Sequence, residues 1–221
     1  MVLPYARLLA LSLAMALMPS PAAAGTSTGR VEFELYRSGH VFGRQSVTVS
    51  ERGGALVAEI NAALHAGLGP VTLFSYTQQC RETWRGGALA SLSCSTRKNG
   101  RNMNVSGAAA NGVISISGIS ARTDFPLSTL PTSWWTRPPL STREMINSET
   151  GERLPVRVSL VGRETIVTNG VRMSTDRIRV QGTVSVDLWY DDAGHWVGCA
   201  FTAQGQHITY RLLSAPADGP A

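Results

Sequence analysis

The chain has 221 residues, a formal net charge of +5 and 43% hydrophobic residues, as expected of a globular protein rather than a disordered one. The basic residues are scattered without a dense run, which argues against a nucleic-acid-binding arm. Only Lys98 is a lysine, so nineteen of the twenty basic residues are arginine. A GC-rich genome produces the same skew, and we infer no anion site from it.

The first segment, residues 1–24, is predicted to be a secretory signal peptide. Arg7 precedes an apolar run over residues 8–18, and small residues end the segment at Ala24, which is the layout of a cleavable export signal. The apolar run is short for a membrane span, and no second run of membrane length follows. We expect an exported chain that starts at Gly25, lacks a transmembrane segment after cleavage and resides in a bacterial periplasm.

Residues 25–213 are predicted to form one all-β domain, because polar and apolar residues alternate with period two between turns rich in Gly and Asn. About eleven strands are expected, with a two-glycine loop at residues 65–69 and a disordered tail at residues 214–221. The main expected strands are 30–37, 41–50, 55–64, the hairpin 72–97, 102–107, 112–118, a run from 154, 171–181, 183–191, 196–203 and 207–213.

The hairpin 72–97 contains two of the three cysteines, Cys80 and Cys94. A loop at residues 85–87 would set them diagonally, and a loop at residues 86–88 would set them directly opposite. Both registers put the two side chains on one face. We therefore expect a disulfide between them in an exported chain, with Cys199 left as a buried thiol.

Residues 123–148 interrupt the strand pattern with four prolines and the pair Trp134-Trp135. Irregular segments of this length in compact domains are often lids or binding loops. Residues 130–135 are predicted to form a short turn or a capped helical turn.

The expected architecture is an antiparallel, up-and-down, strongly curved sheet that forms a half-open or closed barrel, since a sheet this large curls or closes to protect its edges. In the hairpin 183–203, a three-residue loop would place Trp189 beside Val197 and Tyr190 beside Trp196. Both faces would then carry apolar side chains. Such a sheet requires a covering segment, a bound ligand or a partner.

The sequence predicts no catalytic residue, cofactor or metal site, so the protein is not expected to be an enzyme. No histidine lies near a nucleophile motif, and all four lie in or beside predicted turns: His40, His65, His195 and His207. The cluster Asp187, Asp191, Asp192 and His195 has possible oxygen ligands, but Asp before Gly is ordinary turn chemistry. Glu82 is expected to form a cross-strand ion pair.

Aromatic side chains are the predicted ligand-binding residues, because tryptophan combines a large apolar body with one hydrogen-bond donor. The alternative for each of them alone is ordinary core packing. An arginine at the rim would meet an acidic head group. The candidate set is Trp84, Trp134, Trp135, Trp189, Tyr190 and Arg85.

Three motifs occur together: the turn at residues 84–89, the Leu-Pro-Thr-Ser-Trp-Trp segment 130–135, and the Asp-Leu-Trp-Tyr-Asp strand 187–191 before an Asp-Ala-Gly turn. In this combination the chain resembles an exported proteobacterial family of unknown function, over residues 31–211. The resemblance implies no activity and does not include the cysteines. The implied shape is similar to the curved half-barrels of the periplasmic lipoprotein carriers LolA and LolB, an analogy of fold alone.

We therefore expect a non-enzymatic periplasmic protein that binds an apolar or amphipathic small molecule, such as a lipid, inside a curved sheet, with the Pro/Trp segment as lid. The alternative partner is an envelope protein bound to an apolar sheet face. A third hypothesis, an enzyme of unrecognised type, would require a buried His, Asp and Arg cluster that the sequence does not indicate.

Overall fold

The computed structural model describes residues 29–68, 71–168, 170–183 and 185–215. The predicted signal peptide, Asn169 of the expected turn at residues 168–170, and residues 216–221 of the expected disordered tail lie outside this part. The described residues contain no helix of the length and apolarity that a membrane crossing requires.

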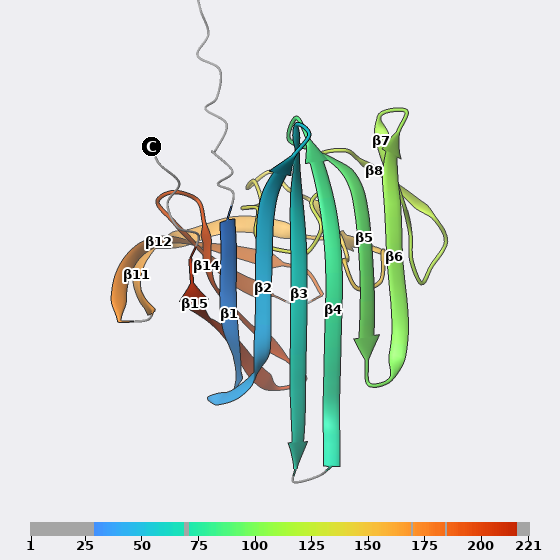
Figure 1. The fold of residues 1–221 in the computed structure, drawn as a ribbon. Helices are drawn as coiled ribbons and strands as arrows, with labels where there is room; N and C mark the ends of the chain where they lie inside the picture. The colour runs from blue at the N-terminus through green and yellow to red at the C-terminus, as the bar shows by residue number, and fades with distance from the viewer. Residues whose placement is uncertain (1–28, 69–70, 169, 184, 216–221) are drawn as a thin grey trace, which may run out of the picture.

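A single antiparallel sheet of thirteen strands dominates the structure (Figure 1). Its strand order is β11-β12-β13-β14-β15-β1-β2-β3-β4-β5-β6-β7-β8, so the first and last strands of the chain pair with each other. The strands are β1 (Gly29–Arg37), β2 (His40–Arg52), β3 (Ala55–Leu68), β4 (Val71–Arg85), β5 (Ala88–Lys98), β6 (Arg101–Ala110), β7 (Val113–Ser117), β8 (Thr123–Pro126), β11 (Arg157–Thr168), β12 (Val171–Gln181), β13 (Val186–Asp191), β14 (Trp196–Ala203) and β15 (Gln206–Ser214).

The prediction of an all-β, antiparallel, strongly curved sheet is confirmed, and the sheet is not closed. Strands β8 and β11 form its two edges. Within the described residues there are fifteen strands rather than about eleven, because the short strands β8, β9 (Glu144–Ile146) and β10 (Arg153–Pro155) have no period-two pattern long enough to predict.

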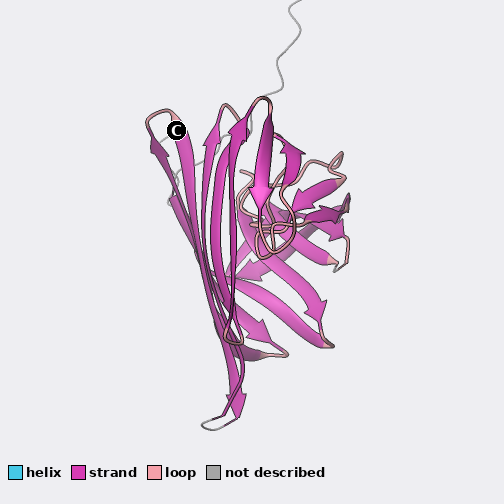
Figure 2. Cartoon of the chain, turned by 90° about the vertical axis from the view of Figure 1, so that its right-hand side faces the viewer, coloured by secondary structure: helices cyan, strands magenta, loops and turns pink. Residues whose placement is uncertain are grey.

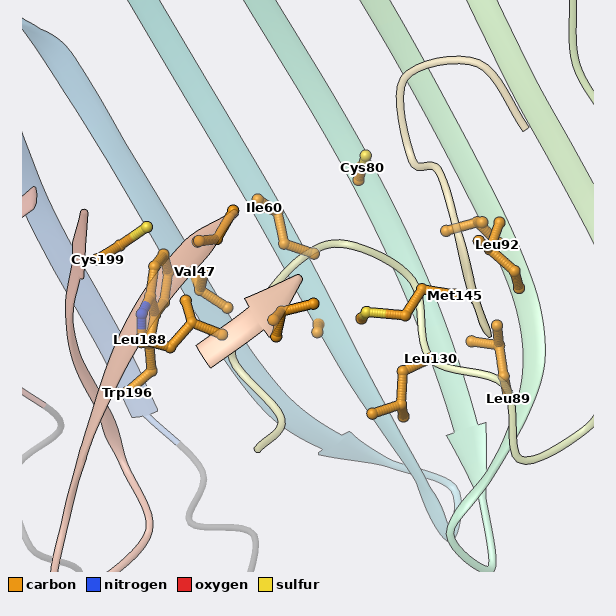
Figure 3. Packing of buried hydrophobic residues seen from close by; sticks show 14 of the residues in the cluster. Val47, Ile60, Cys80, Leu89, Leu92, Leu130, Met145, Leu188, Trp196 and Cys199 are labelled. Carbon is orange, nitrogen blue, oxygen red and sulfur yellow. The ribbon is translucent and has the colours of Figure 1, made fainter. Parts of the chain in front are cut away.

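The inner face of the curved sheet is apolar because the apolar residues of each strand pair with apolar residues of the neighbouring strand on the same face. One inner row runs across β1 to β6 through Val31, Val47, Ile60, Cys80, Cys94 and Val105, all buried. The outer face of β1 carries Glu32 and Glu34 instead. Figure 3 shows how side chains of the long strands pack against Leu188 of β13 and against Leu130 and Met145 of the irregular segment.

Residues 127–156, here called the plug, lie inside the curve between the long strands and the strands β11 to β15 (Figure 2). The plug contains the small hairpin β9–β10, and its residues 130–135 form turns and an isolated bridge rather than a helical turn. Leu130, Met145 and Ile146 are buried against the sheet. The segment that was predicted to be a lid thus packs directly on the inner face of the sheet.

The turn of the central hairpin β4–β5 differs from both predicted loops, but the pairing from Thr83↔Ser91 to Tyr76↔Lys98 is the register predicted for the loop at residues 86–88. The turn consists of Gly86 and Gly87 alone, both with positive φ, and the closing pair is Arg85 with Ala88. A β-bulge at Ala90 then shifts the register by one residue. Cys80 therefore lies directly opposite Cys94, and the predicted disulfide is present, while Cys199 is a buried free thiol.

Two further expectations on strands need correction. The predicted loop at residues 65–69 is strand up to Leu68, since β3 and β4 continue their pairing beyond the expected end. In the hairpin β13–β14, Tyr190 lies opposite Trp196 as expected, but a bulge places Trp189 opposite Gly198 rather than Val197. The ring of Trp189 lies against the backbone at Gly198, where no side chain intervenes.

Candidate functional site

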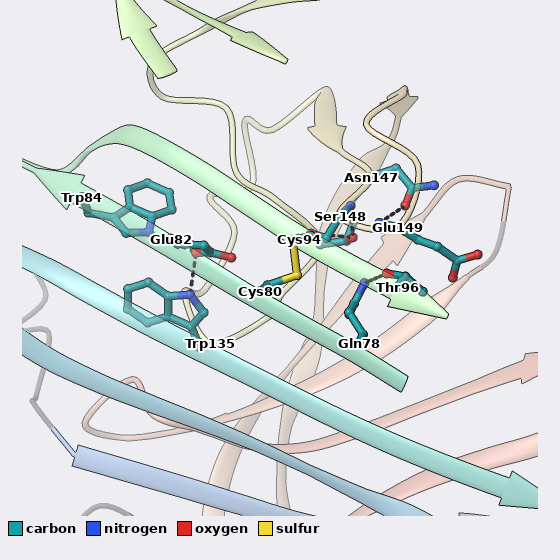
Figure 4. Close-up of a disulfide and its surroundings, with 11 residues drawn as sticks. Gln78, Cys80, Glu82, Trp84, Cys94, Thr96, Trp135, Asn147, Ser148 and Glu149 are labelled. Carbon is teal, nitrogen blue, oxygen red and sulfur yellow. Dashed lines mark hydrogen bonds between the residues drawn. A yellow bond between two sulfur atoms is a disulfide. The ribbon is translucent and has the colours of Figure 1, made fainter. Parts of the chain in front are cut away.

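A buried carboxylate marks the junction between the plug and the sheet. Glu82 of β4 is fully buried on the inner face, and its Oε2 accepts hydrogen bonds from the indole nitrogens of Trp84, at 3.0 Å, and Trp135, at 2.8 Å (Figure 4). The two indole rings meet edge to face with centroids 6.0 Å apart. The expected cross-strand ion pair of Glu82 is wrong, because its cross-strand partners on the inner face are Ala58 and Leu92.

Burial raises the pKa of the Glu82 carboxyl, since the charged form is poorly solvated there. The nearby donors of Trp135, Ser133 and Trp84 act in the opposite direction and do not cancel the effect of burial. The second oxygen, Oε1, is buried and has no hydrogen-bond partner among the described residues. Glu82 therefore takes up a proton more readily than an exposed glutamate does.

Three further contacts attach the plug to both arms of the curved sheet. The Tyr190 hydroxyl donates to the backbone oxygen of Trp134 at 2.7 Å. Arg137 pairs with Asp176 of β12 at 2.9 Å, and Lys98 of β5 pairs with Glu149 at 2.9 Å. The plug thus links strands β4 and β5 to strands β12 and β13, which belong to opposite halves of the sheet.

Four of the six predicted ligand-binding residues meet at this junction. Trp84 and Tyr190 are buried in the core, and Trp134 and Trp135 are half-buried members of the plug. In this conformation all four contact the protein's own groups. Their predicted role in ligand binding would require the plug to move.

The other two predicted residues lie elsewhere. Trp189 is on the outer face, where its indole nitrogen donates to Glu164 and the Arg177 guanidinium lies 5.3 Å from the centre of its ring system. Arg85 is exposed at the β4–β5 turn and reaches the backbone oxygen of Gly53 at 3.4 Å. Tertiary structure therefore divides the predicted set between three places.

At the lower end of the sheet β1 turns into β2, and the long strands β3 and β4 project (Figures 1 and 2). A second group of aromatic side chains lies on the inner face of the strands near this end. Phe42 stacks on Phe74 with centroids 5.5 Å apart, and Phe74 lies 6.5 Å from Tyr76. On β14 and β15, which continue the sheet beyond β1, Phe201 lies 6.4 Å from Tyr210. We call these five half-buried residues the lower aromatic cluster.

Hydrogen-bonding groups lie beside this cluster. The Tyr210 hydroxyl donates to Gln45 Oε1 at 3.4 Å, and Gln78 donates to Thr96 at 3.1 Å. Burial, followed by the nearby Glu149, raises the pKa of Tyr76. Burial also raises the pKa of Tyr210, with smaller contributions from Cys199 and from Tyr76 itself. Both phenols therefore stay neutral at physiological pH and keep their donor hydrogens.

Sequence reasoning did not select the lower aromatic cluster. Its local signal is present, because Phe74 and Tyr76 alternate on one face of β4. The missing information is the pairing of β15 with β1, which brings Tyr210 opposite Leu35 and so to the same inner surface. Among the described side chains, no group of three or more His, Cys, Asp or Glu is placed to hold a metal ion.

Comparison of the sequence with protein-family models places the chain in a family. A family model described as a domain of unknown function, DUF6134, matches residues 33–213, so the chain belongs to that family. The predicted resemblance to a family of unknown function is thereby confirmed. None of the curated proteins matches the sequence significantly.

Two solved structures are similar to the chain. A β-barrel-like protein of the DUF1849 family from Brucella abortus is 7% identical, with a TM-score of 0.62 over 87% of this chain and 98% of the other. LprF from Mycobacterium bovis is 12% identical, with a TM-score of 0.33 over 89% of each chain. The first similarity shows a shared fold alone.

Proposed function

We propose that this DUF6134 protein is a non-enzymatic periplasmic protein that binds an apolar or amphipathic ligand, such as a lipid, on the inner face of its curved sheet. The observation that carries the proposal is the lower aromatic cluster. Its five rings come from β2, β4, β14 and β15 and are only half-buried. Concave surfaces rich in aromatic side chains with a few placed polar groups are typical of ligand sites.

The neighbouring polar groups suit the head of an amphipathic ligand. Tyr76 and Tyr210 are neutral donors, and the Lys98 ammonium is 43% exposed beside its partner Glu149. An acyl or other apolar chain would pack on Phe42, Phe74 and Phe201. An acidic head group would compete with Glu149 for Lys98.

The plug serves as the lid in this proposal. Its present contacts keep Trp84, Trp135 and Tyr190 covered. Release of those contacts would add these three side chains to the apolar surface that a ligand meets. Ligand binding at the lower aromatic cluster does not require that release.

The test combines native mass spectrometry of gently purified protein with titration of a fluorescent fatty acid. We expect a co-purified ligand mass or saturable probe binding, and we expect Phe74→Ser to weaken binding about tenfold or more, since burying a phenylalanine contributes roughly 1.5–3 kcal/mol. The matched control is Ile119→Ser, which removes an exposed apolar side chain outside the cluster. A clean apo mass without probe binding, or equal affinity in both variants, would contradict the proposal.

A second candidate function, binding of an envelope protein, is favoured by the edge strand β11. Leu160 and Val161 are each 48% exposed there, and Val167 is 62% exposed. An unpaired edge with apolar side chains can accept a strand from another chain. Val161→Lys should then abolish co-purification of a defined partner while probe binding stays unchanged; loss of both would assign the partner to the inner face.

A further inference from the structure

The lower end of the sheet is strongly one-sided in charge. Four of the stretches that end or turn there are residues 37–44, 64–68, 71–76 and 97–102. Together they contain five basic residues, two histidines and no aspartate or glutamate: Arg37, Arg44, Arg97, Lys98, Arg101, His40 and His65. Such a field attracts an anionic surface.

Part of this charge has no internal partner. Arg44 pairs with Glu34 at 3.7 Å, and Lys98 pairs with Glu149 at 2.9 Å. Arg97 and Arg101, at the β5–β6 turn, are exposed and form no ion pair with any described residue. Two guanidinium groups are thus available to an external anion.

The same end exposes apolar side chains at its strand tips. Val41 at the start of β2 is 61% exposed, and Leu73 near the start of β4 is 66% exposed. Among the described large apolar side chains of β1 to β6 these two are the most exposed, on β2 and β4 at either side of β3. Behind them on the inner face lie Phe42 and Phe74.

We propose that the lower end docks on an anionic lipid surface. The tips with Val41 and Leu73 enter the head-group layer, while Arg97 and Arg101 contact lipid phosphates, as basic and apolar side chains do together at membrane interfaces. Docking in this way brings the lower aromatic cluster close to the lipid, since Phe42 and Phe74 directly follow Val41 and Leu73 in the chain. The partner is the bilayer surface itself, so the inference goes beyond the binding of a single ligand molecule.

The test is flotation of the exported protein, its N-terminus verified by mass, with vesicles of phosphatidylcholine alone or mixed with phosphatidylglycerol. We expect binding only to the mixed vesicles, weakening as salt rises. Arg97→Glu with Arg101→Glu should lower partitioning about tenfold or more, since each basic residue near an anionic surface strengthens binding and a reversed charge repels the surface. The control, Arg52→Glu with Arg172→Glu, changes the net charge equally at exposed positions on other strand ends.

Leu73→Ser separates insertion from charge alone, and it should weaken binding while near-UV circular dichroism stays unchanged. Equal binding to neutral vesicles, equal losses in the two charge-reversed variants, or full binding by Arg97→Glu with Arg101→Glu would overturn the proposal. Fatty acid titration of the same variants keeps the two proposals apart. Loss of vesicle binding with intact probe binding supports docking and leaves the ligand site standing.

Discussion

At the scale of single residues, Glu82 has a chemistry that its neighbours in sequence do not reveal. Alternation places it on the inner face between Cys80 and Trp84, where a charged carboxylate is poorly solvated. Two indole donors compensate in part, and one of them comes from Trp135, 53 residues further along the chain. The carboxyl thus fixes the position of the plug at a cost in the free energy of the folded state.

This raises a prediction about pH. Because the folded-state pKa of Glu82 is raised, the folded protein binds more protons than the unfolded chain above the ordinary value of 4.5. The contribution of Glu82 to stability is present below that value and is lost as pH rises through the folded pKa. We expect Glu82→Gln, measured by urea unfolding against the wild type, to gain relative stability as pH rises from about 4.5 upward.

A difference between the two proteins that does not depend on pH would contradict the assignment. Asp187 provides an internal contrast, because its pKa is lowered first by hydrogen bonds from Arg179. The contribution of Asp187 to the free energy of unfolding is lost as pH falls. The wild-type plot of stability against pH therefore contains a rise due to Asp187 and a decline due to Glu82. Only the slope above 4.5 should change in Glu82→Gln.

At the scale of elements, the β4–β5 hairpin is fixed by three devices: two glycines with positive φ, one bulge at Ala90, and the disulfide. The cysteines are separated by 14 positions and lie in the inner row of the sheet. Closing a loop of this length restricts the unfolded chain more than the folded one.

Reduction of the disulfide should therefore lower the free energy of unfolding by about 3 kcal/mol on the chain-entropy model. The measurement is urea unfolding with and without a reductant. Cys80→Ala with Cys94→Ala should lie near the reduced wild type and be insensitive to reductant, while Cys199→Ala should keep the wild-type response. An unchanged urea midpoint on reduction of the wild type would contradict this expectation.

At the scale of the whole molecule, the open sheet depends on the plug to cover its apolar inner face. The plug contacts Glu82 and Lys98 in one arm and Asp176 and Tyr190 in the other. Without these contacts, buried side chains of both arms would meet water. In a closed barrel the edge strands β8 and β11 would pair with each other. Here the sheet stays open, and the plug covers its inner face instead.

Tyr190→Phe tests this arrangement, because it leaves the backbone oxygen of Trp134 without its 2.7 Å donor. We expect the free energy of unfolding to fall by about 1–2 kcal/mol and hydrogen exchange to accelerate in the plug before it does in β4 and β5. Tyr36→Phe is the control, since that phenol donates to Glu34 on the outer face. Equal exchange in both variants would show that the plug does not depend on this contact.

The sequence by itself determined the strand class, the antiparallel topology, the disulfide and the existence of an irregular segment. These features follow from period-two alternation, Asn-Gly and Gly-Gly turns, and cysteine spacing, which are local properties of the chain. The pairing of Tyr190 with Trp196 was also predicted from such local properties. The sequence did not predict the β-bulges. One extra residue at Ala90 or near Tyr36 changes the strand register without a recognisable change in the alternation of polar and apolar residues.

Only the tertiary structure decided which aromatic side chains share a surface. Trp84 meets Trp135 through Glu82, whereas Trp189 faces outward with Arg177, although Trp84 and Trp189 both lie in alternating strands. The lower aromatic cluster exists because β15 pairs with β1, which places Phe201 and Tyr210 on the inner face of the strands that adjoin β1 and β2. Contacts between residues far apart in the chain depend on strand order and sheet curvature. The alternation of polar and apolar residues along one strand gives no information about either.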